Sequence, residues 1–187
     1  MDAVRKAVIG VALAAFAACF GWALSTLFLS RPVIQGAMWL PFFLGIFPLV
    51  FFVISGGRGV RSWRPGRVEF SYSQLRAHLP LGVLIVGMAL FLACWLLAMS
   101  AFRTLSDGGP ATVNGLFYAD NHGSYTPITE ARYHELQLAE QRVFTAVPAA
   151  FYLAGAIFLS WFVRRSTARS AYAADSVAER ERATGAG

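Results

Sequence analysis

The chain has 187 residues, of which 57% are hydrophobic and only 14% are charged, and its formal net charge is +6. A soluble domain carries about 25% charged residues, so the composition argues against a soluble globular protein. The basic residues flank long apolar runs instead of lining a polar surface, which argues against a nucleic-acid-binding domain. The composition therefore indicates an integral membrane protein that forms one compact unit.

Four apolar runs without Asp, Glu, Lys or Arg follow one another along the chain. At a rise of ~1.5 Å per residue, a helix over each run is long enough to cross the ~30 Å hydrocarbon core of a bilayer. We therefore predict an all-α integral membrane protein. It would be a four-helix transmembrane bundle with a small extracytoplasmic β-hairpin and a helix extension between the third and fourth helices. The predicted spans are residues 7–29, 33–55, 79–102 and 143–163.

The first span follows two basic residues, as the apolar part of a signal peptide does, but it is too long for that region, and we expect a retained membrane anchor. Cys19 and Cys94 lie within apolar runs, where two thiols fit neither a disulfide framework nor a zinc site, so we expect buried apolar side chains.

Small residues recur at every fourth position in the first and fourth spans and form a smooth stripe along each predicted helix. Such a stripe lets two helices approach closely, either within one chain or in a homodimer. We favour packing between the first and fourth spans of one chain. The stripe residues are Gly10, Ala14, Ala18, Ala146, Ala150 and Ala154.

The second span contains Pro41, Gly45 and Pro48, a pattern that predicts a kinked helix. Broken helices line substrate sites in some transporters, so one alternative is a small transporter or channel subunit whose second span lines a path. The spans lack ionisable residues, which argues against ion-coupled transport. We favour kinks that only shape the bundle.

Within residues 56–78, an arginine recurs at every third position from 58 to 67, but the glycines and the proline among them disfavour a helix. We expect an extended cytoplasmic loop that contacts anionic lipid headgroups, to which each basic residue contributes ~1 kcal/mol. The candidate lipid contacts are Arg58, Arg61, Arg64 and Arg67.

The basic residues are divided unequally between the two sides that four spans define. The side that holds both termini and residues 56–78 carries twelve of them, whereas the other side carries four. The positive-inside rule then predicts a multi-pass protein of the cell membrane, of bacterial type by its Arg- and Ala-rich composition, with both termini in the cytoplasm. The segment 166–187 would be a flexible cytoplasmic tail, and residues 103–142 would lie outside the cytoplasm.

The extracytoplasmic segment 103–142 has the composition of a small folded unit. Two aromatic-bearing runs flank Asn121, His122 and Gly123, where the glycine permits a tight turn, so we predict a β-hairpin. Thr129 is placed to cap a helix with Glu130 in its first turn, and we expect that helix to continue to about Arg165. An isolated hairpin is only marginally stable and must pack on the bundle or on a partner.

Aromatic and polar side chains make this segment the best candidate for a partner-contact surface. The candidate residues are Phe117, Tyr118, Asp120, His122, Tyr125, Tyr133 and His134. Asp120, His122, Glu130, His134 and Glu135 are also acceptable metal ligands, but no specific ligand motif accompanies them, and exposed polar residues are the favoured interpretation. We therefore assign no catalytic residue, cofactor or metal.

We predict a non-enzymatic membrane protein that acts through protein contacts, as an accessory, sensor-like or immunity-type protein. Its partner would be another membrane protein or a second copy of the chain. The transporter or channel alternative remains open, as does a membrane enzyme that uses the extracytoplasmic histidines and carboxylates.

Overall fold

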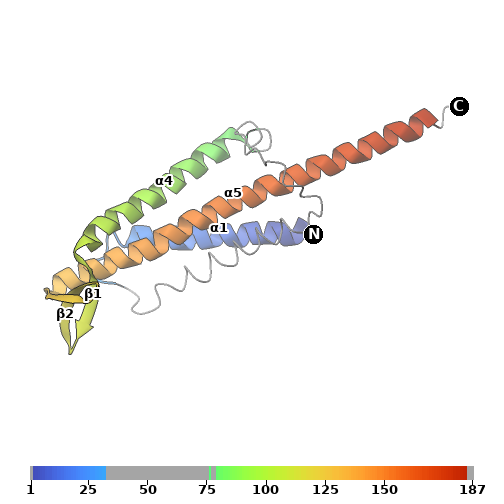
Figure 1. The fold of residues 1–187 in the computed structure, drawn as a ribbon. Coiled ribbons are helices and arrows are strands. Elements are labelled where there is room, and N and C mark those ends of the chain that lie inside the picture. The colour runs from blue at the N-terminus through green and yellow to red at the C-terminus, as the bar shows by residue number, and fades with distance from the viewer. Residues whose placement is uncertain (1, 33–75, 77–78, 185–187) are drawn as a thin grey trace.

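The computed structural model describes residues 2–32, 76 and 79–184 (Figure 1). Within these residues the chain forms three helices, one short 3-10 turn and three strands. The helices are α1 (Asp2–Ser25), α4 (Leu81–Thr104) and α5 (Glu130–Thr184), and the 3-10 turn is η1 (Leu105–Asp107). The strands are β1 (Gly109–Val113), β2 (Leu116–Asn121) and β3 (Ser124–Pro127).

The predicted all-α four-helix bundle is wrong. The described chain instead combines three helices with a three-stranded antiparallel sheet of order β1-β2-β3, so the unit between α4 and α5 is larger than one hairpin. The predicted second span at 33–55, with Pro41, Gly45 and Pro48, and the arginine loop with its four candidate lipid contacts lie outside the described residues.

In the part of the chain that the structure describes, three helical segments are long and apolar enough to cross a membrane, namely Lys6–Ser25, Leu81–Asp107 and Glu130–Trp161. They include the first, third and fourth runs that the sequence marks as spans. This agreement is compatible with insertion into a membrane.

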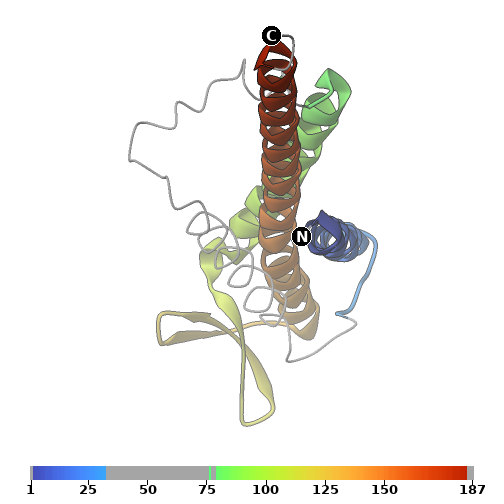
Figure 2. The same cartoon turned by 90° about the vertical axis from the view of Figure 1, so that its right-hand side faces the viewer.

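Helix α5 is the central element of the molecule. It packs along both α1 and α4, whereas α1 and α4 contact each other little (Figure 2). Helices α1 and α4 both run toward the sheet, and α5 runs away from it, so the N-terminus and the far end of α5 lie at the end opposite the sheet (Figure 1). With 55 residues, α5 is on the order of 80 Å long. It passes Arg165, where we expected it to end, and is helical through residues 166–184, most of the predicted tail.

Small side chains form the contact between the three helices. One buried cluster contains Ala23, Ala98 and Ala146, one from each helix. A second cluster contains Cys19 and Cys94 together with two alanines of α5, and both cysteines are free thiols, as expected for buried apolar side chains. Small residues allow helix backbones to approach closely, and this close packing is what holds helices together in lipid.

The predicted stripes are only partly located at these contacts. Ala146 and Ala150 lie in the core, but Ala154 is exposed, as are Gly10, Ala14 and Ala18. Helix α1 turns a different set of small residues inward, because its side chains are small or apolar around much of its circumference and several faces suit packing. The buried residues of this inward face are Ala12, Cys19 and Ala23.

Two Gly-containing turns build the sheet. Asn114 and Gly115 join β1 to β2 with φ values of 51° and 79°, and His122 and Gly123 join β2 to β3 with φ values of 53° and 91°. Two residues with positive φ form the turn that matches the twist of a two-residue hairpin. The predicted turn at His122 and Gly123 is thus present, and a second turn of the same kind precedes it.

The junctions on either side of the sheet are fixed by local chemistry. Before β1, Gly108 has a φ of 125°, and a Cβ there would lie 2.7 Å from the carbonyl oxygen of Asp120, so only glycine fits without strain. After β3, the Thr129 hydroxyl accepts a hydrogen bond from the Arg132 backbone N–H at 3.2 Å, which is the predicted cap of α5.

Candidate functional site

The inner face of the sheet is attached to the first turns of α5 through Tyr133. The rings of Phe117 and Tyr133 are 4.7 Å apart. The Tyr133 hydroxyl accepts hydrogen bonds from the Thr112 hydroxyl at 3.1 Å and from the Gln137 amide at 3.0 Å. One tyrosine therefore joins β2 to the helix by a tilted ring contact and β1 by one hydrogen bond, while Gln137 of the same helix donates to its hydroxyl.

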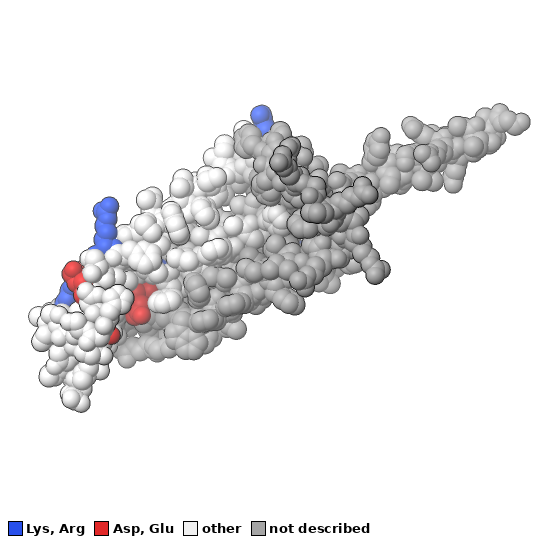
Figure 3. Space-filling model, in the orientation of Figure 1, with Lys and Arg blue, Asp and Glu red and all other residues white. Residues whose placement is uncertain are grey.

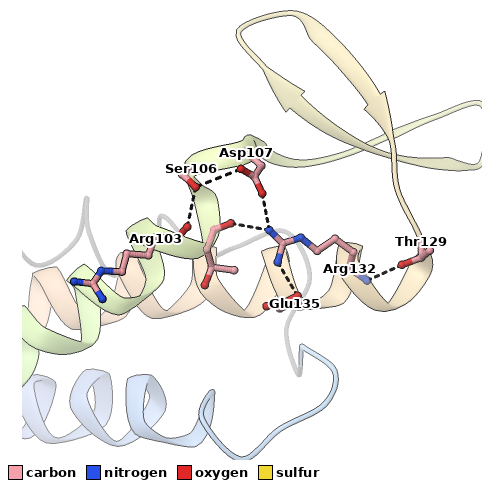
Figure 4. Close-up of polar contacts among 7 residues, drawn as sticks. Arg103, Ser106, Asp107, Thr129, Arg132 and Glu135 are labelled. Atoms are coloured by element: carbon pink, nitrogen blue, oxygen red, sulfur yellow. Dashed lines mark hydrogen bonds and ion pairs between the residues drawn. The ribbon is translucent and has the colours of Figure 1, made fainter.

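Arg132 joins the end of α4 to the start of α5 (Figure 4). Its guanidinium donates to a carboxylate oxygen of Asp107 at 3.0 Å, to one of Glu135 at 2.8 Å and to the backbone carbonyl of Thr104 at 3.3 Å. The neighbouring Arg103 side chain points away from this cluster (Figure 4). Exposed ion pairs stabilise by less than about 1 kcal/mol each, but one guanidinium that holds three groups fixes the position of η1 relative to α5.

The opposite face of the sheet is covered by no described element. Side chains alternate between the two faces along each strand, and Thr112 and Phe117 point toward α5, so the other set points away from it. We call this set the free face. It consists of Ala111, Val113, Leu116, Tyr118, Asp120, Tyr125 and Pro127.

The free face is apolar and exposed. Leu116 is 61% exposed, Tyr125 52% and Val113 39%. The rings of Tyr118 and Tyr125 meet edge to face, with their centroids 6.1 Å apart. The sheet that projects from the helices is uncharged over most of the surface seen in Figure 3, and the acidic and basic residues gather nearer to the helices. Exposed tyrosine and leucine side chains on a sheet are typical of a protein-contact surface.

Proline blocks both edges of the sheet. Along an antiparallel strand, successive residues point their backbone N–H and C=O groups alternately toward the neighbouring strand and away from it. The N–H of Ile128 donates to the Phe117 carbonyl, so residue 128 points toward β2 and the backbone groups of residues 125 and 127 point outward from β3. The same alternation turns the backbone of Pro110 outward from β1. Since Pro110 and Pro127 have no N–H, each edge lacks a donor that an added strand requires.

The polar candidate residues are mostly used within the fold. The Asp120 carboxylate accepts a hydrogen bond from the Gly123 N–H at 2.7 Å and stabilises the turn. The ring nitrogens of His134 lie 3.2 Å from the Gln137 amide oxygen and 3.4 Å from the Glu130 carboxylate. His122 is exposed in the turn. Among the described residues, no three His, Cys, Asp or Glu side chains gather as a metal site would require.

The structure therefore divides the seven predicted contact residues. Tyr118 and Tyr125 lie on the free face, whereas Phe117 and Tyr133 lie between the sheet and α5. Ala111 and Val113 of the free face were not predicted, because they lie on β1 and that strand was not expected. The Asn-Gly pair at 114 and 115 is the strongest short-range hairpin signal and would have predicted that strand.

No protein-family model matches this chain, and neither a curated protein nor a solved structure is significantly similar to it.

Proposed function

We propose that this protein is a non-enzymatic, multi-pass protein of the cell membrane that binds another protein through the free face of its sheet. One observation carries the proposal: an exposed apolar face that includes Tyr125 and Leu116 lies on a sheet fixed to α5 by Tyr133 and Arg132. A fixed sheet loses little conformational freedom when a partner binds, and this favours recognition.

The orientation that we propose has both termini in the cytoplasm and the sheet on the other side of the membrane. The distribution of basic residues supports it, because the side that holds both termini and residues 56–78 carries twelve of them and the other side carries four. The position of the N-terminus and the far end of α5 at one end of the molecule, opposite the sheet, agrees with it (Figure 1). In this orientation the four arginines of 58–67 would contact anionic headgroups on the cytoplasmic face.

The chemistry of the free face defines the partner surface. Asp120 is the one charged side chain on this face, and one of its carboxylate oxygens accepts a hydrogen bond that holds the turn between β2 and β3. The other side chains of the face are uncharged. The blocked edges argue against recognition by an added strand. The partner therefore presents an apolar, uncharged surface that packs flat against the tyrosines.

The size of the free face indicates which class of protein that partner belongs to. Three strands of about five residues cover roughly 17 Å by 14 Å, or about 250 Å². A stable interface covers about 800 Å² of each partner, so the sheet alone supports only a weak contact. A stable complex needs further contact along the apolar helices, and we therefore propose a membrane-protein partner for an accessory or sensor-like role.

Site-specific photocrosslinking in native membranes tests this proposal. Benzoylphenylalanine at position 125 or 116 lies on the free face, and the same residue at position 126 is the matched control, because Thr126 is also exposed but points to the other face. We expect one discrete adduct from positions 116 and 125 and none from position 126. Equal crosslinking from all three positions would contradict the proposal.

The mass of the adduct separates the two possible partners. An adduct with a different membrane protein supports the proposal, whereas an adduct of twice the mass of the chain assigns the free face to a homo-oligomer instead. Reporter fusions test the orientation independently. A reporter that works only in the cytoplasm should be active when it is fused after residue 187. A reporter that works only outside the cytoplasm should be active when it is inserted between Asn114 and Gly115.

A further inference from the structure

A guanidinium that pairs with no carboxylate among the described residues lies where the three helices meet at their sheet-side ends. Arg142 of α5 donates from Nε to the Thr26 hydroxyl at 3.0 Å and from Nη2 to the Thr26 backbone carbonyl at 3.3 Å. It also donates from Nη1 to the Ser100 hydroxyl of α4 at 3.3 Å. Thr26 directly follows α1 and is buried, Arg142 is half-buried, and Ser100 is exposed, so the cluster opens to the surface.

The two hydroxyl groups are oriented toward the guanidinium as acceptors. Thr26 donates its own proton to the Ala23 carbonyl, and Ser100 donates to the Leu97 carbonyl, each at 2.7 Å. A guanidinium has five N–H groups, and the three contacts use one on each nitrogen. Arg142 is therefore held in one orientation, with a second N–H left on each of Nη1 and Nη2.

Four of the five acidic residues in the segment 103–142 contact groups other than Arg142. Asp107 and Glu135 bind Arg132, Glu130 contacts His134, and Asp120 stabilises a turn.

The fifth acid on this side, Glu140, lies two positions before Arg142, and residues two apart on a helix do not face each other. None of the described carboxylates forms an ion pair with Arg142. Residues 33–68 contain no acidic residue at all. Within the described part of the chain, no carboxylate therefore supplies a counter-charge for this cation.

We propose that the guanidinium of Arg142 binds a phosphate oxyanion through its two remaining N–H groups. Arg142 directly precedes the charge-free run 143–163, and Ser100 lies near the end of the run 79–102, so both stand at the level where a bilayer places its phosphate groups. The paired N–H groups of a guanidinium suit phosphate oxygens. The phosphate belongs to a lipid headgroup or to a soluble phosphate, and the inference does not depend on which protein binds the free face.

A carboxylate placed beside Arg142 should occupy the site in place of phosphate. Ser100→Asp does this at an exposed position, and Ser100→Asn is the neutral control of the same shape. Arg103→Gln is a second control, because it lowers the net charge by the same one unit and Arg103 takes no part in the cluster. Equal thermal unfolding midpoints of the two Ser100 variants would establish that the helices remain packed.

Native mass spectrometry of the full-length protein in detergent, with dioleoylphosphatidylglycerol or dioleoylglycerol added, measures lipid binding. We expect wild type, Ser100→Asn and Arg103→Gln to retain the phospholipid, Ser100→Asp to bind it about tenfold or more weakly, and the phosphate-free lipid not to bind. In a second arm, inorganic phosphate is titrated while thermal unfolding is followed. If inorganic phosphate raises the unfolding midpoint of wild type but not that of Ser100→Asp, and wild type binds no phospholipid, the site is assigned to soluble phosphate.

Three results would overturn the inference. The first is phospholipid binding to Ser100→Asp at the wild-type level. The second is an equal loss in Arg103→Gln and Ser100→Asp, which would reveal attraction by net charge alone. The third is the absence of an effect of both phospholipid and inorganic phosphate on the wild-type protein.

Discussion

The attachment of the sheet to α5 can be tested by removing a single oxygen atom. Tyr133→Phe keeps the ring that contacts Phe117 but deletes the hydroxyl that accepts hydrogen bonds from Thr112 and Gln137. Thr112 is exposed and regains a partner from water, whereas Gln137 is only 8% exposed and loses one inside the structure. An unsatisfied buried amide costs about 1–3 kcal/mol, so the sheet should separate from the helix about 5- to 150-fold more often.

Amide hydrogen exchange of the purified protein measures this opening directly. In Tyr133→Phe, the amides of residues 109–127 should exchange faster by that factor, while those of the distant half of α5 should be unchanged. Tyr125→Phe is the matched control, because the Tyr125 hydroxyl forms no hydrogen bond with the described residues and lies on the free face. Exchange that is equal in both variants and wild type would show that the Tyr133 hydroxyl does not hold the sheet.

Three further substitutions test the fold. Gly108→Ala places a Cβ 2.7 Å from a backbone oxygen of β2 at a positive φ and should destabilise the sheet by about 2 kcal/mol or more. Gly115→Ala is the control, because it has a positive φ but open space around the Cβ, and it should cost about 1 kcal/mol. The same exchange assay measures both variants. Gly87→Val places a Cβ 2.6 Å from a side-chain carbon of α5, and the overpacking should lower the free energy of unfolding by about 1–3 kcal/mol and with it the thermal midpoint. Gly82→Val has nothing within 4 Å of its Cβ and should leave the midpoint unchanged. Pro127→Thr restores an edge N–H, and size-exclusion chromatography should then detect self-association; elution identical to wild type would contradict the role assigned to the proline.

The parts of the fold that the sequence predicted correctly are those that local chemistry determines. A bilayer requires about twenty apolar residues without charge, so the runs at 7–29, 79–102 and 143–163 could be identified without knowing their neighbours. The Thr129 cap and the turn at His122 and Gly123 likewise depend on a few adjacent residues.

The missed features depend on distant residues. Lipid and helix core are both apolar, so hydropathy does not reveal which side of α1 faces inward, and the predicted stripe at Gly10 proved to be exposed. The partners of Arg132 and Arg142 come from α4 and from the end of α1, up to 116 positions away in the chain. No spacing rule connects residues so far apart. The missing strand β1 is different, because its Asn-Gly turn was a local signal that the interpretation did not use.

Two arginines in the sheet-side part of α5, Arg132 and Arg142, locate the proposed membrane surface along that helix. Arg132 is neutralised by two carboxylates, as expected for a cation near water, whereas Arg142 is held by hydroxyl and carbonyl oxygens alone. Ten residues of helix separate them by about 15 Å. If Arg142 marks the phosphate level, the sheet stands roughly that far above it, and the free face lies beyond the headgroups in water. A partner must then have an apolar surface that rises about as far from the bilayer, which a protein confined to the lipid cannot present.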